Sequence, residues 1–163
     1  MIDGVDLRIE DVLKEKGFVA AHPKGISMRP FLRANDTIIL KTIDGDVKTG
    51  DPILFKRSDG VYVLHRVVAV NGDRILTRGD FEKKCDAPIT RADVLAILTE
   101  YYSGRKHVFT DDPKYIRKIT RWNGKGRKRR VALRRFVYRS LSFVKRLPQK
   151  LFKRKNKDNE KKD

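Results

Sequence analysis

One serine and one histidine in the chain have the types and settings needed for a hydrolytic pair. Ser27 lies in the segment 25–30 (GISMRP), where a glycine allows close approach of the backbone and a proline turn can present the hydroxyl. His65 lies within residues 61–70, the longest β-forming run. Taken singly, such a serine is more often a cap or turn residue, and such a histidine a core residue. Together they could form a nucleophile and its general base.

Two aspartates could complete the pair. Asp80 follows Gly79, and Asp86 lies six residues further on. A carboxylate holds the imidazole in the right tautomer and stabilises the imidazolium, so either acid could serve, although Gly-Asp is also a common turn. The remaining histidines fit less well, because His22 stands beside a proline in a loop and His107 lies near the edge of the β region.

Four short stretches occur in a characteristic order: 27–31 (SMRPF) with Asp36 after it, 49–55 (TGDPILF), 64–68 (LHRVV) and 77–80 (TRGD). In this order they resemble the successive boxes of type I signal peptidases, over about residues 18–100. The histidine in LHRVV is similar to that of the archaeal and endoplasmic-reticulum branch, where it replaces the bacterial lysine base.

The resemblance implies a serine endopeptidase with Ser27 as nucleophile and His65 as base, and Asp86 as the acid in preference to Asp80, a supporting acid near the site. It implies an extended peptide or preprotein substrate, bound as an added β-strand, with small residues before the scissile bond. The Ser27 N–H would stabilise the oxyanion. Gly25 stands where many relatives supply a second donor, which leaves that donor open.

Two departures from the family are visible. The chain begins with a charged segment where signal peptidases of this branch have a membrane anchor, and Phe81 follows Asp80 where Asn is usual. The related self-cleaving repressor peptidases share the Ser-Met box, but they use a lysine base and carry a helix-turn-helix domain, so they match less well. Neither a cofactor nor a metal is expected. The lone Cys85 excludes an intramolecular disulfide.

The elements that must position these residues are mainly strands. β-branched and aromatic runs occupy residues 37–42, 52–57, 61–70, 74–77 and 94–101. Asn71-Gly72 between two of them predicts a hairpin. Apolar spacing over residues 6–16, ended by Gly17, predicts a short helix. We therefore expect a mainly β fold, a signal-peptidase-like coiled antiparallel sheet with a short N-terminal helix and a basic C-terminal helical tail.

The net charge of +18 belongs entirely to the tail. Residues 1–113 hold 18 basic and 18 acidic side chains, whereas residues 114–163 hold 21 basic and 3 acidic ones. We expect an N-terminal helix over 1–16, a catalytic β domain over 17–110, a basic amphipathic helical region over 111–152, and a disordered charged tail over 153–163.

Within the tail, apolar residues recur every three or four positions over residues 131–151, between arginines and lysines. This pattern favours a helix lying on an anionic membrane surface. Nucleic acid is a less favoured partner, with Tyr115 and Trp122 as possible stacking residues, and plain packing on the β domain is the third reading. No transmembrane helix or cleaved signal peptide is expected, and we predict a cytoplasmic protein peripheral at the membrane. The alternative is a non-catalytic module of the same fold whose tail binds nucleic acid or a partner.

Overall fold

The computed structural model describes residues 8–146. The chain divides into two compact units, Met1–Arg127 and Lys128–Asp163, and the described residues hold eight strands, three α-helices and one short 3-10 helix. In chain order the elements are α1 (Ile9–Lys16), β1 (Phe18–Ala21), β2 (Thr37–Lys41), β3 (Pro52–Lys56), β4 (Tyr62–Asn71), β5 (Arg74–Arg78), β6 (Ile89–Thr90), the 3-10 helix η1 (Arg91–Asp93), β7 (Val94–Ser103), β8 (Lys106–Phe109), α2 (Pro113–Asn123) and α3 (Arg127–Arg146).

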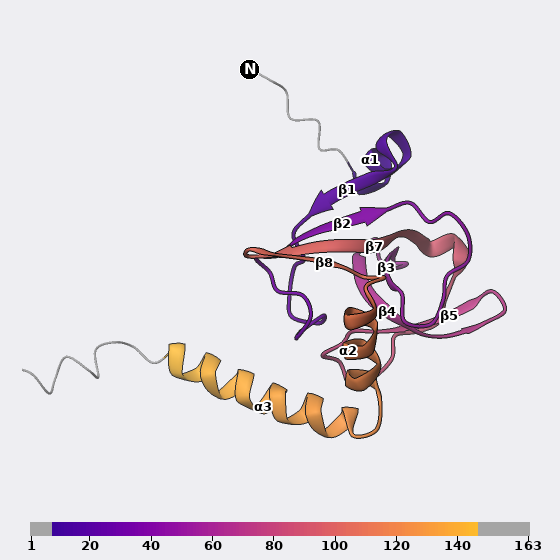
Figure 1. Cartoon of the computed structure of the whole chain (residues 1–163). Coiled ribbons are helices and arrows are strands. Elements are labelled where there is room, and N and C mark those ends of the chain that lie inside the picture. The colour runs from indigo at the N-terminus through magenta and orange to yellow at the C-terminus, as the bar shows by residue number, and fades with distance from the viewer. Residues whose placement is uncertain (1–7, 147–163) are drawn as a thin grey trace, which may run out of the picture. The chain divides into compact units, whose positions relative to one another are not determined.

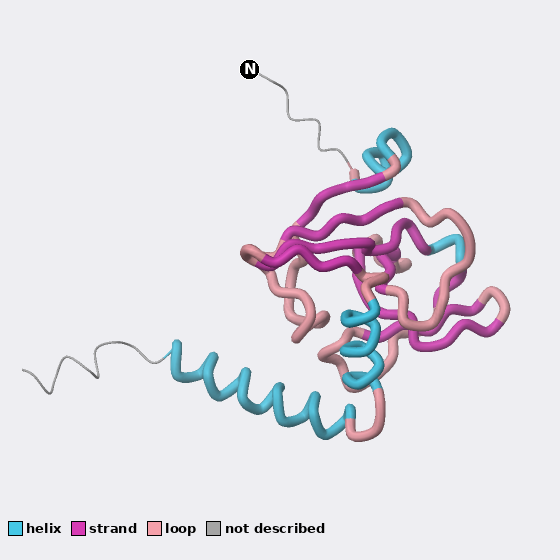
Figure 2. Tube along the Cα trace, viewed as in Figure 1, coloured by secondary structure: helices cyan, strands magenta, loops and turns pink. Residues whose placement is uncertain are grey.

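The strands form one antiparallel sheet in the order β1-β2-β7-β3-β4-β5-β6, with β8 paired to β7 (Figures 1 and 2). The register shifts within the β2–β7, β3–β7 and β4–β5 pairs. Such bulges bend and twist strands, and the sheet curls into a half-barrel. The predicted mainly β, coiled antiparallel fold is therefore confirmed.

Strand β4 holds the residues around which the site is built. It pairs with β3 on one side, where Ile53 lies opposite His65, and with β5 on the other, where Arg78 lies opposite Arg66. Because His65 and Arg66 are consecutive in a strand, their side chains leave opposite sides of it. A cluster of buried apolar side chains packs beside His65 and fixes this strand: Val47, Ile53, Phe55, Val67, Ile75 and Val94.

The five predicted strands and the Asn71-Gly72 hairpin are present, each strand end agreeing within two residues. Three short strands were not predicted: β1, β6 and β8. Each has only two to four residues, too few for the alternation of a strand to stand out from its flanks.

The predicted domain boundary at residue 110 differs from the compact unit, which extends to Arg127. Helix α2 belongs to this unit because its apolar face is buried. Tyr115 and Trp122 are 6% and 8% exposed, and both rings meet Phe31 edge-on. Asp112 caps the helix by accepting from the Lys114 N–H.

Helix α3 starts at Arg127, four residues before the predicted start at residue 131. The predicted end at residue 151, the charged tail 153–163 and the first residues of the predicted N-terminal helix lie outside the described residues. Between residues 8 and 146, no helix combines the length and the apolar character needed to cross a bilayer.

Candidate active site

Ser27 sits in a tight double turn that its neighbours anchor. The Met28 carbonyl accepts from the N–H groups of Phe31 and Leu32, and the side chains of these three residues are buried. The Ser27 carbonyl accepts from the Phe81 N–H at 2.7 Å. In the described part of the chain the Ser27 N–H donates no hydrogen bond. The backbone is thus fixed on both sides of the serine while its N–H remains available to an incoming oxygen.

His65 is held by an acid. Its Nδ1 lies 2.7 Å from Asp86 Oδ2, and the same oxygen accepts from Thr77 Oγ1 at 2.7 Å. The Asp86 N–H also donates to the Thr77 carbonyl at 2.9 Å. Thr77 is a fully buried residue of β5, so its hydroxyl holds the Asp86 carboxylate in a fixed position.

The ionisation of Asp86 fixes the tautomer of the histidine. Burial alone would raise the pKa of Asp86, but hydrogen bonds from His65 and Thr77 outweigh burial and hold that pKa below its usual range. An ionised carboxylate only accepts hydrogen bonds, so His65 Nδ1 must donate to it. In the neutral imidazole the lone pair then lies on Nε2, where a general base requires it.

Ser27 and His65 meet at Gly79. A methyl group placed on Gly79 would lie 2.8 Å from the Ser27 carbonyl oxygen and 3.0 Å from His65 Nε2, so these two atoms are at most about 5.8 Å apart. Among the described residues, no hydrogen bond joins Ser27 Oγ to His65. The fold thus brings Ser27, His65 and Asp86 together. The His65–Asp86 hydrogen bond is formed, whereas the one between Ser27 Oγ and His65 is not.

All three residues line a single open cavity of about 620 Å3. Most of its wall is aliphatic, with Leu32, Ile38, Leu40, Leu54 and Val63 among the lining residues. His22 also lines it, but its Nδ1 is engaged with the Asp36 carbonyl at 3.0 Å. A cavity of this kind can take apolar side chains of a ligand beside one polar, proton-transferring edge.

Asp80, the second acid predicted for the site, does not reach His65. Both its oxygens accept from Arg66, at 2.9 Å and 2.8 Å, and Arg66 also donates to Tyr115 Oη and to the Gly50 carbonyl. The Asp80 side chain is 1% exposed. Burial acts to lower the pKa of Arg66, but the adjacent Asp80 raises it above its ordinary value. Asp80 is therefore part of a buried ion pair on the other side of β4.

His107 lies outside the site. Its Nε2 is 2.5 Å from Glu100 Oε2 and its ring stacks on Tyr102, within the hairpin of β7 and β8.

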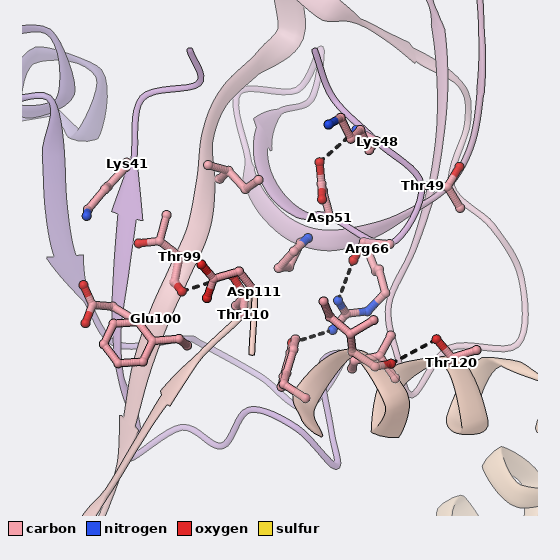
Figure 3. A pocket seen from close by; sticks show the side chains of 17 residues that line it. Lys41, Lys48, Thr49, Asp51, Arg66, Thr99, Glu100, Thr110, Asp111 and Thr120 are labelled. Carbon is pink, nitrogen blue, oxygen red and sulfur yellow. Dashed lines mark hydrogen bonds between the residues drawn. The ribbon is translucent and has the colours of Figure 1, made fainter. Parts of the chain in front are cut away.

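A second and larger cavity, of about 820 Å3, is lined by Arg66, Glu100 and Tyr115, with lysines, threonines and aspartates around it (Figure 3). It contains none of the predicted catalytic residues, and its charges are of both signs.

Tyr115 and Trp122, predicted as possible base-stacking residues, are buried. Burial raises the pKa of Tyr115, and the Trp122 indole donates to the Asp80 carbonyl at 3.0 Å. Neither ring can stack on a nucleotide while α2 stays packed, so this support for a nucleic-acid partner is removed.

Sequence reasoning missed Thr77 and Arg127, although both touch the site's framework. Thr77 belongs to the TRGD stretch and alternates with Ile75 on the buried face of β5, which was a usable signal. Arg127 lies in a run of basic residues that is typical of solvated charge, so no signal distinguished it.

Among the described residues, no group of three or more His, Cys, Asp or Glu side chains could hold a metal ion. No family model matches the chain, and no curated protein matches its sequence.

Proposed function

We propose that the chain is a serine endopeptidase in which Ser27 attacks the substrate, His65 is the general base and Asp86 orients His65. The observation that carries this proposal is the 2.7 Å contact between His65 Nδ1 and Asp86 Oδ2, which leaves Nε2 beside the Ser27 segment. An ionised carboxylate, an imidazole and a hydroxyl, arranged in this order, are the parts of a nucleophilic hydrolase.

In the proposed reaction, His65 Nε2 takes the proton of Ser27 Oγ as that oxygen attacks a peptide carbonyl. The Ser27 N–H donates to the oxyanion that forms. The imidazolium, stabilised by Asp86, gives its proton to the leaving amine, and an acyl-enzyme remains on Ser27. Water then adds with His65 again as base, which releases the acid product and restores the free hydroxyl.

The resemblance to type I signal peptidases supports the same assignment, since it covers the stretches containing Ser27 and His65. A curled antiparallel sheet is compatible with a substrate that binds as an extended strand. The aliphatic wall of the 620 Å3 cavity favours apolar substrate side chains near the cleavage point. We therefore propose an extended peptide or preprotein as substrate.

We also propose that the chain is a cytoplasmic protein that α3 holds on an anionic membrane surface. Helix α3 contains nine basic and no acidic residues. Four large apolar side chains at helical spacing are 46–70% exposed: Leu133, Phe136, Val137 and Leu141. Apolar insertion and roughly 1 kcal/mol for each cation near the lipid would add up to stable attachment.

Vesicle binding tests the attachment. The full chain, Phe136→Ser and the control Val70→Ser, which changes an exposed valine of β4, are sedimented with anionic and with neutral vesicles. We expect binding to anionic vesicles by the native chain and by Val70→Ser, and a clear loss for Phe136→Ser. Binding to RNA with no binding to vesicles would instead favour a nucleic-acid partner.

Peptide hydrolysis tests the chemistry. The native chain and Ser27→Ala are each incubated with a mixed peptide library, and new termini are read by mass spectrometry. We expect cleavages made only by the native chain, and a preference among them that reports the residues before the scissile bond. Equal cleavage by both proteins would point to a contaminant.

A second candidate function is a non-catalytic module of the same fold, with α3 as its binding element. The observation that favours it is the missing hydrogen bond between Ser27 Oγ and His65 in the described structure. Catalytic hydrogen bonds are often long in ligand-free structures, so this observation alone does not outweigh the His65–Asp86 geometry.

A further inference from the structure

The backbone of residues 79–82, in the connection between β5 and β6, lies against both Ser27 and His65. Gly79 approaches the Ser27 carbonyl and His65 Nε2 so closely that a methyl group would lie within 3.0 Å of each. Two residues on, the Phe81 N–H donates to the Ser27 carbonyl at 2.7 Å. A shift of this segment would therefore move the Ser27 carbonyl, to which it is hydrogen-bonded, relative to His65.

The same segment is held from behind by one guanidinium group. Arg127 Nη2 lies 3.0 Å from the Gly79 carbonyl, 3.3 Å from the Asp80 carbonyl and 2.9 Å from the Glu82 carbonyl. Arg127 is 6% exposed. Carbonyl oxygens carry partial negative charge, so three of them around Nη2 of a buried cation stabilise its charge and at the same time hold the curvature of the segment.

A second donor supports the first. Trp122 Nε1 donates to the Asp80 carbonyl at 3.0 Å, and the indole ring meets Phe31 edge-on with centroids 6.0 Å apart. Phe31 belongs to the turn that follows Ser27. Asn123 orients Arg127 by accepting from its Nε at 3.0 Å. The end of α2 thus contacts both the Ser27 turn and the segment 79–82.

We propose that Arg127, assisted by Trp122, is a positioning residue for the peptidase site. It sets the approach of Ser27 to His65 through the backbone of residues 79–82 and touches neither the substrate nor the reacting atoms. This inference rests on the proposed function. Both residues lie outside the part of the chain that resembles signal peptidases, so the site depends on a C-terminal element that such a resemblance does not include.

The experiment compares full-length variants by the rate at which a serine-directed covalent probe labels Ser27. Arg127→Met removes the donors, Arg127→Lys keeps a cation that can reach the same carbonyls, and Trp122→Phe removes one donor while keeping a ring. Arg117→Met, at an exposed arginine of α2, is the matched control. Each rate is measured at a temperature where circular dichroism shows the variant folded.

We expect labelling of Arg127→Met to fall by about ten-fold or more, because small displacements of reacting groups have effects of this size. Arg127→Lys should recover part of the rate, Trp122→Phe should lose a smaller factor, and Arg117→Met should match the native chain. Probe concentration at half-saturation should stay unchanged, since the cavity wall is untouched. A folded Arg127→Met that labels at the native rate would overturn the inference.

Amide hydrogen exchange at Phe81 separates the two possible failures. We expect faster exchange of the Phe81 N–H in Arg127→Met, because the segment that donates it to Ser27 is released. A native chain that never labels, with faster Phe81 exchange in the variant, would contradict the proposed function but not the role of Arg127 in holding residues 79–82. Unchanged exchange of the Phe81 N–H would contradict the role of Arg127 in holding residues 79–82. If Arg127→Met does not fold, Trp122→Phe and Arg127→Lys give the same comparison.

Discussion

Two neighbouring side chains of β4 each pair with an aspartate of the same region, yet the two pairs differ in their access to water. Arg66 and Asp80 are 4% and 1% exposed as side chains, and the pair is closed under α2. His65 and Asp86 are 11% and 29% exposed, and they face the cavity that contains Ser27. The same kind of contact therefore serves two purposes on opposite sides of one strand.

The difference lies in what each pair can do with a proton. The guanidinium of Arg66 stays charged, so its pair can only stabilise the arrangement of β4, the segment 79–82 and α2. The imidazole of His65 can change its protonation, and its open side gives a substrate access to Nε2. The buried Arg66–Asp80 pair therefore stabilises the fold, and the partly exposed His65–Asp86 pair can exchange a proton with a ligand.

The largest effect should follow from Asp86→Asn. The amide would donate to His65 Nδ1 and so place the imidazole proton on Nε2, where the base must be free. We expect Ser27 labelling by a covalent probe to fall by about 10⁴-fold, as in other triads with this change, with little loss of thermal stability. A labelling rate within a few-fold of the native rate would show that Asp86 does not orient the base.

Removal of the acid from the buried Arg66–Asp80 pair should instead lower the stability of the fold. Asp80→Asn leaves Arg66 buried without its charge partner, so we expect the free energy of unfolding to fall by roughly 3–5 kcal/mol. Urea titration measures this change. Asp59→Asn is the matched control, since it removes an ion pair to Arg57 whose partners are about half exposed. Equal, small losses for both variants would contradict the closed character of the Arg66–Asp80 pair.

A smaller effect should follow from Thr77→Val, which keeps the shape of the side chain and removes its hydroxyl. The Thr77 hydroxyl helps to hold the pKa of Asp86 down, so that pKa should rise in the variant, with a loss of about 1 kcal/mol in stability. Carboxyl NMR titration reads the pKa. Thr110→Val removes a hydroxyl bonded to the Leu98 and Thr99 carbonyls and should leave the Asp86 titration unchanged.

The smallest effect should belong to a surface pair. Glu10 of α1 accepts from Lys56 and Tyr62, and these hydrogen bonds lower its pKa to about 2. A carboxylate with a lowered pKa stabilises the fold above its unfolded pKa of about 4.3, and this contribution disappears as pH falls toward the folded value. The melting temperature of Glu10→Gln should therefore lie slightly below the native one at neutral pH and converge with it near pH 2. A constant gap would exclude this titration.

The sequence was sufficient to predict the mainly β fold, because five of the strands are long enough to show alternation and the Asn71-Gly72 turn is distinctive. Ser27, His65 and Asp86 were also predictable, from their order along the chain. Asp86 was favoured over Asp80 only through the resemblance, since both aspartates follow β5 closely, and in the structure Asp86 contacts His65 whereas Asp80 pairs with Arg66.

The role of the C-terminal region was the least predictable part. Trp122 and Arg127 lie in a strongly basic stretch, and such stretches are usually solvated. Their burial depends on the Phe31 ring and on three backbone carbonyls of residues 79–82, which are distant in sequence. Contacts of this kind leave no periodic signal in either segment.

The most direct test of the central claim is to treat the folded native chain, Ser27→Ala and His65→Ala with several classes of serine-directed covalent probe and to locate each adduct by mass. The account predicts one adduct on Ser27 in the native chain, none in Ser27→Ala and a strongly reduced yield in His65→Ala. A folded native chain that reacts with no probe, or an adduct on Ser27 that forms equally well without His65, would contradict it.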